Sequence, residues 1–226
     1  LLKINDIIFN SIELITQQKE KITKEYFTVD HFFKSVIKKN RKLEILADNL
    51  VTVKDSFLNS NKFYKKKKTL IFSILNITPD SFSDGGDNLS LNDSLRNAEQ
   101  MINDGADFID IGGESTRPGS DVVLPADEAI RVLPIIQKLS SKKLKLSLDT
   151  RNSSTMELGL LAGVNIINDV SALKNDPKSV EIIKKYNVPV ILMHMPGNPQ
   201  TMMKKNKYKN VVLDVYDFLE ERIKFC

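Results

Sequence analysis

The stretch Leu70–Gly86, LIFSILNITPDSFSDGG, decides the fold class of this chain. It opens with a short apolar run, residues 70–75, broken only by Ser73, and it turns polar at Asn76. An apolar run of this kind, rich in β-branched and aromatic residues and followed by Pro and Gly, is typical of a strand buried on both faces of a parallel sheet. Ligands of parallel sheets bind at the carboxyl ends of the strands. We therefore expect the chemistry at Asn76 and in the loop after it.

The chain beyond this stretch repeats the same plan: an apolar run, polar residues at its end, then a helix. The predicted strands are 70–75, 108–111, 144–148, 165–167 and 188–192, and the predicted helices are 89–103, 126–139, 153–161, 177–186 and 211–224. This alternation indicates βαβ units with right-handed crossovers. Polar residues at each strand end favour a TIM (β/α)₈-type barrel, in which they converge on one mouth. A whole barrel takes about 250 residues, so about five βα units predict an incomplete one.

Composition excludes several classes of protein. The chain has 226 residues, of which 27% are charged and 41% apolar, as in an ordinary globular protein. Neither a membrane-spanning run nor a secretory signal pattern is visible. The net charge of +4 is too small and too dispersed to indicate nucleic-acid binding. Cys226 is the only cysteine, which favours a reducing, cytoplasmic location.

Residues 1–64 differ from the rest of the chain, since they contain neither Gly nor Pro and are rich in Lys, Asn, Ile and Phe. Apolar residues at helical spacing predict helices around 4–15, 26–37 and 43–53. We expect a small helical N-terminal extension, or the tail of an upstream module, followed by the barrel from residue 65. The absence of an initial methionine before Leu1 also suggests a piece of something longer.

The strand ends predict one binding site. Asp149 and Asn168 end neighbouring strands, and together they offer the acceptors and donors that suit the amidine-like edge of a pterin or guanine ring. An alternative is that Asp149 caps the helix that begins near residue 153. Met193 would give the ring a polarizable wall, although core packing explains an isolated Met equally well.

A second group of residues suits an anionic leaving group. Arg117, in the loop after the second strand, has the planar fork that binds phosphate, although most loop arginines are simply solvated. Asn76 offers an amide oxygen, the kind of ligand that Mg²⁺ takes while bridging to substrate phosphates. Together they predict a diphosphate site.

Five motifs, in order, resemble the dihydropteroate synthase family. They are NITPDSFSDGG, IDIGGESTRPGS, LSLDTRNSS, GVNIINDVSAL and VPVILMHMPGNPQTM, and the resemblance covers about residue 70 to the C-terminus. It implies a TIM barrel of folate biosynthesis that condenses (7,8-dihydropterin-6-yl)methyl diphosphate with 4-aminobenzoate, giving 7,8-dihydropteroate and diphosphate. It also implies assistance by Mg²⁺, competition by sulfonamides, and a homodimer.

The resemblance carries over residue by residue. It implies that Asn76 binds Mg²⁺ and diphosphate, and that Asp149 and Asn168 bind the pterin edge. It further implies that the pterin slot is lined by Val170 and Met193. The loop that contacts diphosphate and aminobenzoate would contain Thr116, Arg117 and Pro118. The mobile first loop would contain Pro79, Asp80 and Phe82. Arg117 would stabilise the leaving diphosphate and Asp80 the pterin-methyl cation, so these two are the predicted catalytic residues.

The chain also departs from the family pattern. The family has a further pterin-binding Asp, a Lys and a paired Arg and His on later strands, and no equivalents follow before Cys226. We expect either a truncated or split enzyme that needs a C-terminal half, or a non-catalytic fragment, with little turnover or stability alone. A fused folate-pathway module upstream is a further expectation. Another pterin-binding barrel, such as a methyltetrahydrofolate methyltransferase, is disfavoured by the TPDSFSDGG and GESTRPG loops.

Overall fold

The computed structural model describes residues 2–4, 7–45, 47, 69–77, 87–115, 122–197, 201–202 and 207–226. The chain forms two compact units, Leu1–Thr69 and Leu70–Cys226. No helix in the described part of the chain is both long and apolar enough to cross a membrane.

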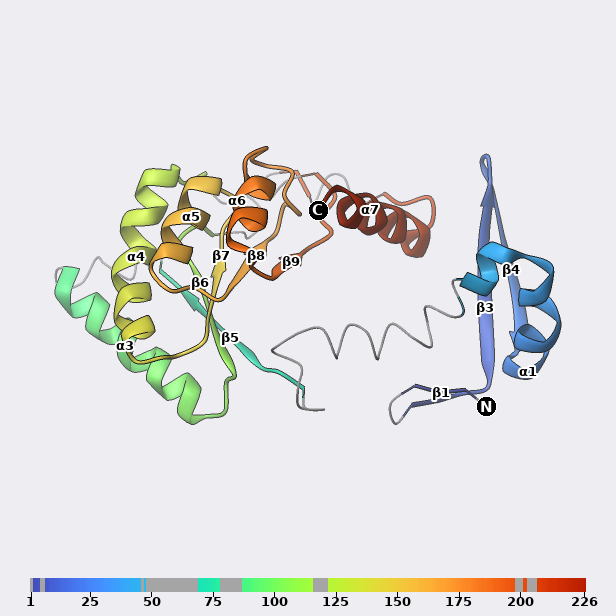
Figure 1. Ribbon diagram of the computed structural model, residues 1–226, viewed down its shortest axis with the longest axis horizontal. Coiled ribbons are helices and arrows are strands. Elements are labelled where there is room, and N and C mark those ends of the chain that lie inside the picture. The colour runs from blue at the N-terminus through green and yellow to red at the C-terminus, as the bar shows by residue number, and fades with distance from the viewer. Residues whose placement is uncertain are drawn as a thin grey trace. The chain divides into compact units, whose positions relative to one another are not determined.

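The first unit contains two β-hairpins followed by short helical turns (Figure 1). The antiparallel pairs are β1 (Leu2–Ile4) with β2 (Ile7–Phe9), and β3 (Ser11–Gln18) with β4 (Lys21–Thr28). The turns are α1 (Val29–His31), the π-helical η1 (Phe32–Val36) and the 3₁₀-helical η2 (Ile37–Lys39), and residues 41–45 are also helical. The helices predicted from Tyr26 and Leu43 onward therefore correspond in part to helical segments.

The helix predicted over residues 4–15 is wrong, because this segment forms strands. Cross-strand pairs decide the outcome: the hydroxyls of Thr16 and Thr23 lie 2.6 Å apart, and Tyr26 donates to Glu13 at 2.7 Å. Such pairs form only between two strands that lie side by side. The two-residue loop between β3 and β4 has Lys19 at a φ of 54°. It contains no Gly or Asn-Gly, the residues by which a hairpin turn is normally recognised in a sequence.

The second unit alternates strands and helices as predicted. Its strands are β5 (Phe72–Asn76), β6 (Phe108–Gly112), β7 (Leu146–Asp149), β8 (Ile166–Asp169) and β9 (Val190–Leu192). Its helices are α3 (Asp87–Asn103), α4 (Pro125–Ser141), α5 (Ser153–Leu161), α6 (Ser179–Tyr186) and α7 (Val211–Phe225). All strand pairs are parallel, in the order β5-β6-β7-β8-β9. This open sheet with helices confirms the α/β class and fits an incomplete barrel.

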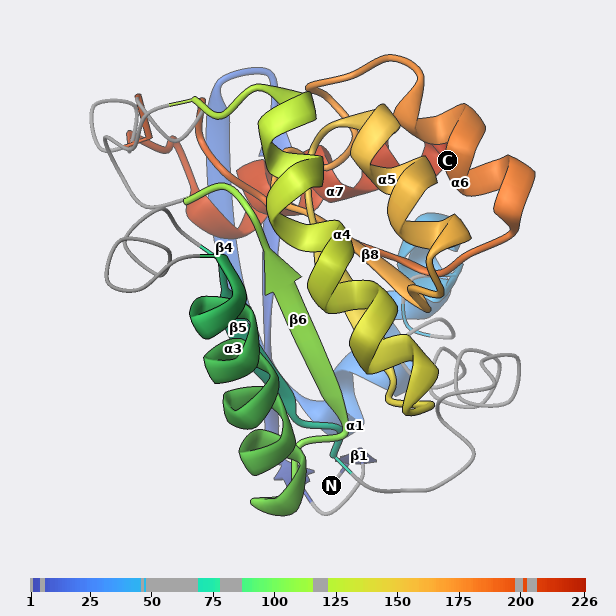
Figure 2. The same ribbon diagram turned by 90° about the vertical axis from the view of Figure 1, so that its left-hand side faces the viewer.

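The hydrophobic core lies between one face of this sheet and the helices α3–α6 (Figures 1 and 2). Leu75, Ile111, Leu148 and Ile167 occupy one row across four strands and are at most 6% exposed. Successive residues of a strand point to opposite faces of the sheet. Asn76, Gly112, Asp149 and Asn168, each one residue further along its strand, therefore belong to the face opposite the core. That face is the one that a closed barrel would enclose.

Helix α7 lies on the other side of the sheet from α3–α6 (Figures 1 and 2). It is held there by Arg222, which is 6% exposed and donates to the carbonyl oxygens of Ala172 and Leu173 at 2.8 and 3.3 Å. In a closed barrel the helices form an outer ring. Among the described residues β9 is the edge strand next to β8, and α7 packs on the loop after β8.

Candidate active site

The register of the sheet aligns the predicted strand-end residues in one row. Asn76 lies opposite Gly112, Gly112 opposite Asp149, and Asp149 opposite Asn168. These four residues, from four different strands, are consecutive neighbours across the carboxyl edge of the sheet. The structure therefore brings Asn76, Asp149 and Asn168 together at one edge of the sheet, and their common role in binding stays a prediction.

Gly112 leaves room for about one methyl group in the middle of this row. A methyl group built on its Cα would lie 3.4 Å from Asn76 Oδ1 and 3.7 Å from Asp149 Oδ2. Two oxygen atoms from different strands therefore flank one gap that no side chain fills. A ligand atom that enters this gap would meet both.

Asp149 has the electrostatic properties of a functional carboxylate. Burial, reinforced by the carboxylate of Asp110, raises the pKa of Asp149 to about 7. Asp149 Oδ1 is buried and has no hydrogen-bond partner among the described residues. The alternative role as a helix cap is wrong, because α5 begins at Ser153 and its N-cap residue is Asn152. A shifted pKa at a strand end is typical of a site that binds or reacts.

Asn168 is oriented by a carboxylate that sequence reasoning missed. Its Nδ2 donates to Asp110 Oδ2 at 3.0 Å, which turns its amide oxygen the other way. Asp110 lies in the middle of β6, is 8% exposed, and its Oδ1 has no partner among the described residues. The signal was present: an aspartate inside the otherwise apolar strand FIDIG is unusual, since buried carboxylates are costly.

The two predicted slot residues take different positions. Val170, directly after β8, is buried, whereas Met193, directly after β9, is 37% exposed. The backbone N–H of Met193 donates to the carbonyl of Asp169 at 3.4 Å, which keeps the two strand ends together. Core packing therefore does not explain Met193.

Six predicted site residues lie outside the described part of the chain. They are Pro79, Asp80 and Phe82 of the first loop and Thr116, Arg117 and Pro118 of the second. Their roles stay predictions.

A buried ion pair fixes the loop after β7. Arg151 binds Glu114 through two parallel hydrogen bonds of 2.7 and 2.8 Å, and the two side chains are 13% and 7% exposed. A guanidinium fork on a carboxylate is among the strongest and most directional pairs in proteins. Because Glu114 follows β6 and Arg151 follows β7, the pair links the ends of two neighbouring strands.

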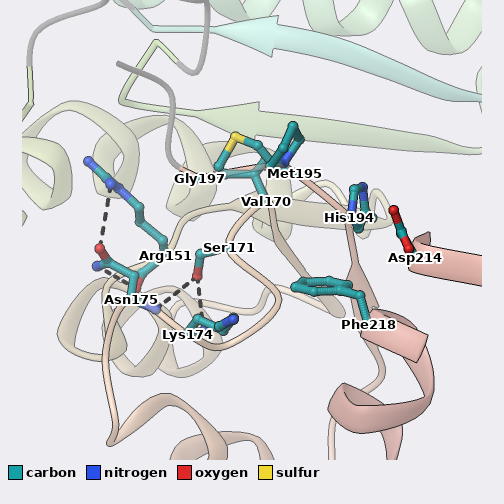
Figure 3. Close-up of a pocket in the computed structure, with 11 residues that line it drawn as sticks. Arg151, Val170, Ser171, Lys174, Asn175, His194, Met195, Gly197, Asp214 and Phe218 are labelled. Carbon is teal, nitrogen blue, oxygen red and sulfur yellow. Dashed lines mark hydrogen bonds between the residues drawn. The ribbon is translucent and has the colours of Figure 1, made fainter. Parts of the chain in front are cut away.

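A pocket of about 470 Å³ opens beside the row of strand-end residues, between α7 and the loops after β7, β8 and β9 (Figure 3). Its lining comprises Arg151, Val170, Ser171, Lys174, Asn175, His194, Met195, Pro196, Gly197, Asp214 and Phe218. Figure 3 shows His194 facing Asp214 and Phe218 on one side, with Arg151 and Asn175 on the other. The pocket shares Val170 with the predicted pterin slot, but Asn76, Asp149, Asn168 and Met193 do not line it.

The donor atoms that face the gap at Gly112 are oxygens. Within the described ranges, no three His, Cys, Asp or Glu side chains gather as a metal site. Asn76 Oδ1 and Asp149 Oδ2 face one gap, and oxygen ligands of this sort fit a hard cation that keeps most of its water.

Known proteins that resemble this chain share its second unit. The sequence profile of a family described as pterin binding enzyme matches residues 72–226. Dihydropteroate synthase of Bacillus subtilis is 42% identical over 162 residues, covering 71% of this chain and 54% of the relative. Dihydropteroate synthase of Neisseria meningitidis serogroup B is 45% identical over 162 residues, covering 70% of this chain and 56% of the relative. The chain thus spans about half the length of these curated relatives.

Solved structures give the same result. Yersinia pestis dihydropteroate synthase, determined as a sulfonamide drug complex, has a TM-score of 0.65 at 39% identity, covering 70% of this chain and 58% of the other. The Xanthomonas albilineans enzyme with 4-aminobenzoic acid has a TM-score of 0.62 at 40% identity, covering 70% of this chain and 55% of the other. With a family profile that matches more than half of its residues and a matching fold, this chain belongs to the pterin binding enzyme family.

Proposed function

We propose that this chain carries the pterin-binding part of a dihydropteroate synthase. The reaction joins (7,8-dihydropterin-6-yl)methyl diphosphate to 4-aminobenzoate and yields 7,8-dihydropteroate and diphosphate. The supporting observation is the pair of buried carboxylate oxygens, Asp110 Oδ1 and Asp149 Oδ1, that have no partner among the described residues. Unpaired buried acceptors are costly, so they favour a ligand rich in N–H donors.

The edge of the pterin ring supplies such donors. Its amino group and ring N–H would donate to the carboxylate of Asp149, and the amide oxygen of Asn168 would accept a further N–H. That amide oxygen is available because Asn168 Nδ2 is held by Asp110. Val170 and Met193 would contact the faces of the ring, where a polarizable thioether packs well.

The reacting carbon would then lie near Asn76. The bond between the pterin methylene carbon and diphosphate breaks, and its electron pair leaves with diphosphate. The amine nitrogen of 4-aminobenzoate forms the new C–N bond and loses a proton. Arg117 is proposed to stabilise the leaving group and Asp80 the cationic pterin. Pro79 and Phe82 would close over the aminobenzoate, with Thr116 and Pro118 beside it, and exclude water.

Magnesium is proposed as the metal of this site. Asn76 would supply an oxygen ligand, and the ion when bound would neutralise charge on the diphosphate. This fits the amide oxygen of Asn76, which lies beside Gly112.

Product formation tests the proposal. The 226-residue chain is mixed with pterin diphosphate, labelled 4-aminobenzoate and Mg²⁺, and compared with Asp149→Asn and with Asp127→Asn, an exposed aspartate of α4. Turnover that Asp149→Asn abolishes and Asp127→Asn leaves intact supports an enzyme. Pterin binding without turnover supports the second candidate, a fragment of a split enzyme; neither binding nor turnover refutes both.

Several expectations remain to be tested in the same preparation. A homodimer predicts twice the chain mass in sedimentation. A split enzyme predicts that a C-terminal half from a relative restores turnover, and competition by sulfonamides should follow. A fused folate-pathway module upstream and a cytoplasmic location are likewise proposed, to be checked on the protein in its own cells.

A further inference from the structure

A buried carboxylate on α4 is not used by the proposed reaction. Glu128 is 0% exposed, and its Oε2 accepts two hydrogen bonds of 2.9 Å, from Thr150 Oγ1 and from Asn152 Nδ2. Both donors lie within three residues after Asp149 in sequence. Burial raises the pKa of Glu128, so the fold tolerates an expensive group at this position.

The same segment is tied to the neighbouring strand end. The backbone N–H of Thr150 donates to the carbonyl of Asn168 at 3.0 Å, and the hydroxyl of Thr150 accepts the N–H of Asn152 at 3.2 Å. Thr150 is therefore held by Glu128 through its side chain and by Asn168 through its backbone. Any displacement of Thr150 moves Asp149 relative to Asn168.

Helix α4 holds the end of β6 as well. Arg131 Nη1 donates to the carbonyl of Gly113 at 2.9 Å, and a Cβ at Gly113 would come within 3.0 Å of Glu128 Cγ. One helix thus makes contact behind both Gly112–Gly113 and Asp149–Thr150. The distances across the gap that Asp149 and Asn76 flank depend on this contact.

We propose that Glu128 is a positioning residue, which holds the Thr150–Asn152 segment and thereby directs the carboxylate of Asp149 toward the pterin. The proposal rests on the proposed function for the identity of the ligand. A carboxylate suits the task because it accepts both hydrogen bonds with charge assistance, whereas an amide presents a donor as well. A purely structural role would instead affect stability and leave ligand affinity unchanged.

The test compares three variants by titration with the fluorescent pterin-6-carboxylate and by thermal unfolding. Glu128→Gln should raise the Kd about tenfold, which corresponds to about 1.4 kcal/mol. Asp127→Asn, next to it but exposed, should leave the Kd within about twofold. Ile136→Val, 0% exposed in the core contact of α4, should lower the melting temperature and also leave the Kd unchanged. An equal rise in Kd for Glu128→Gln and Ile136→Val would overturn the proposal.

A second readout does not depend on the ligand. Amide hydrogen exchange at Thr150 reports its bond to Asn168, and we expect about tenfold faster exchange in Glu128→Gln than in the unaltered chain. If Glu128→Gln does not fold, Thr150→Val removes the same hydroxyl donor and should give the same two results. No pterin binding by the unaltered chain refutes the proposed function, and exchange alone then decides the role of Glu128. Unchanged exchange refutes the positioning role.

Discussion

Two adjacent glycines at the end of β6 should respond in opposite ways to the same substitution. Gly112 has an ordinary backbone conformation, and an added methyl would meet Asn76 Oδ1 at 3.4 Å and Asp149 atoms at 3.7 Å, which is normal contact. Gly112→Ala should therefore fold well, and it should raise the free energy of unfolding by about 0.4–1 kcal/mol through lower chain entropy. The methyl fills the gap between the two side chains, so pterin affinity should fall at least about tenfold, or about 1.4 kcal/mol.

Gly113→Ala should have the reverse signature. Its methyl would lie 2.8 Å from Val132 Cγ1 and 3.1 Å from the backbone oxygen of Glu128. Val132 is 0% exposed, so neither neighbour has free space to move into. Overpacking of this kind costs about 1–3 kcal/mol. We expect a clear loss of stability, with ligand affinity reduced only as far as the strand end shifts.

Urea unfolding and pterin titration on the same two proteins separate these effects. If Gly112→Ala binds pterin as tightly as the unaltered chain, the ligand does not enter the gap between Asn76 and Asp149, and the proposed site is wrong. If Gly112→Ala loses as much stability as Gly113→Ala, the distances from Gly112 to Asn76 and Asp149 are shorter than the structure gives them.

Three further predictions concern charged groups. Because burial and nearby carboxylates raise the pKa of Asp149 from 3.8 to about 7, the free energy of unfolding should fall as pH rises from about 4 to about 7, by at most about 4 kcal/mol. Asp149→Asn should remove this part of the slope in urea unfolding; an unchanged slope contradicts the shift. Arg151→Met should cost about 3 kcal/mol, since it strands the buried carboxylate of Glu114, and adding Glu114→Gln should recover part of it; no recovery would mean that the pair is not the cause. Arg222→Met removes the donor to two backbone carbonyls after β8, so it should cost about 1.5–3 kcal/mol and speed proteolysis of α7; a protease-resistant variant would refute that anchoring.

The second unit could be predicted from sequence because each level of structure agrees with the next. Five apolar runs end in polar residues, and the helices α3, α4, α6 and α7 show 3.6-residue periodicity, so local pattern and tertiary fold indicate the same elements. The carboxyl ends of neighbouring parallel strands lie at one edge. For that reason alone, Asn76, Asp149 and Asn168 could be predicted to lie near one another before any coordinate was known.

The features that could not be predicted from sequence depend on contacts between segments. The β3–β4 hairpin is decided by opposite side chains such as Thr16 and Thr23, which no periodicity within one segment reveals. A glutamate such as Glu128, in the first turn of a helix, is ordinary and normally solvated. Only packing of α4 against the ends of β6 and β7 makes it a buried acceptor.

The partners of the buried carboxylates argue for where the ligand binds. Glu114 is paired with an arginine, and Asp169 accepts the backbone N–H groups of the loop that follows it. Glu128 also keeps one unpaired oxygen, which lies on the helix side of the sheet. Asp110 and Asp149 belong to the opposite face, where each keeps an unpaired buried oxygen. Two neighbouring acids on the inner face, Asp110 and Asp149, therefore both keep an open acceptor, which favours a donor-rich ligand there, because unsatisfied buried acceptors lower stability until they are bound.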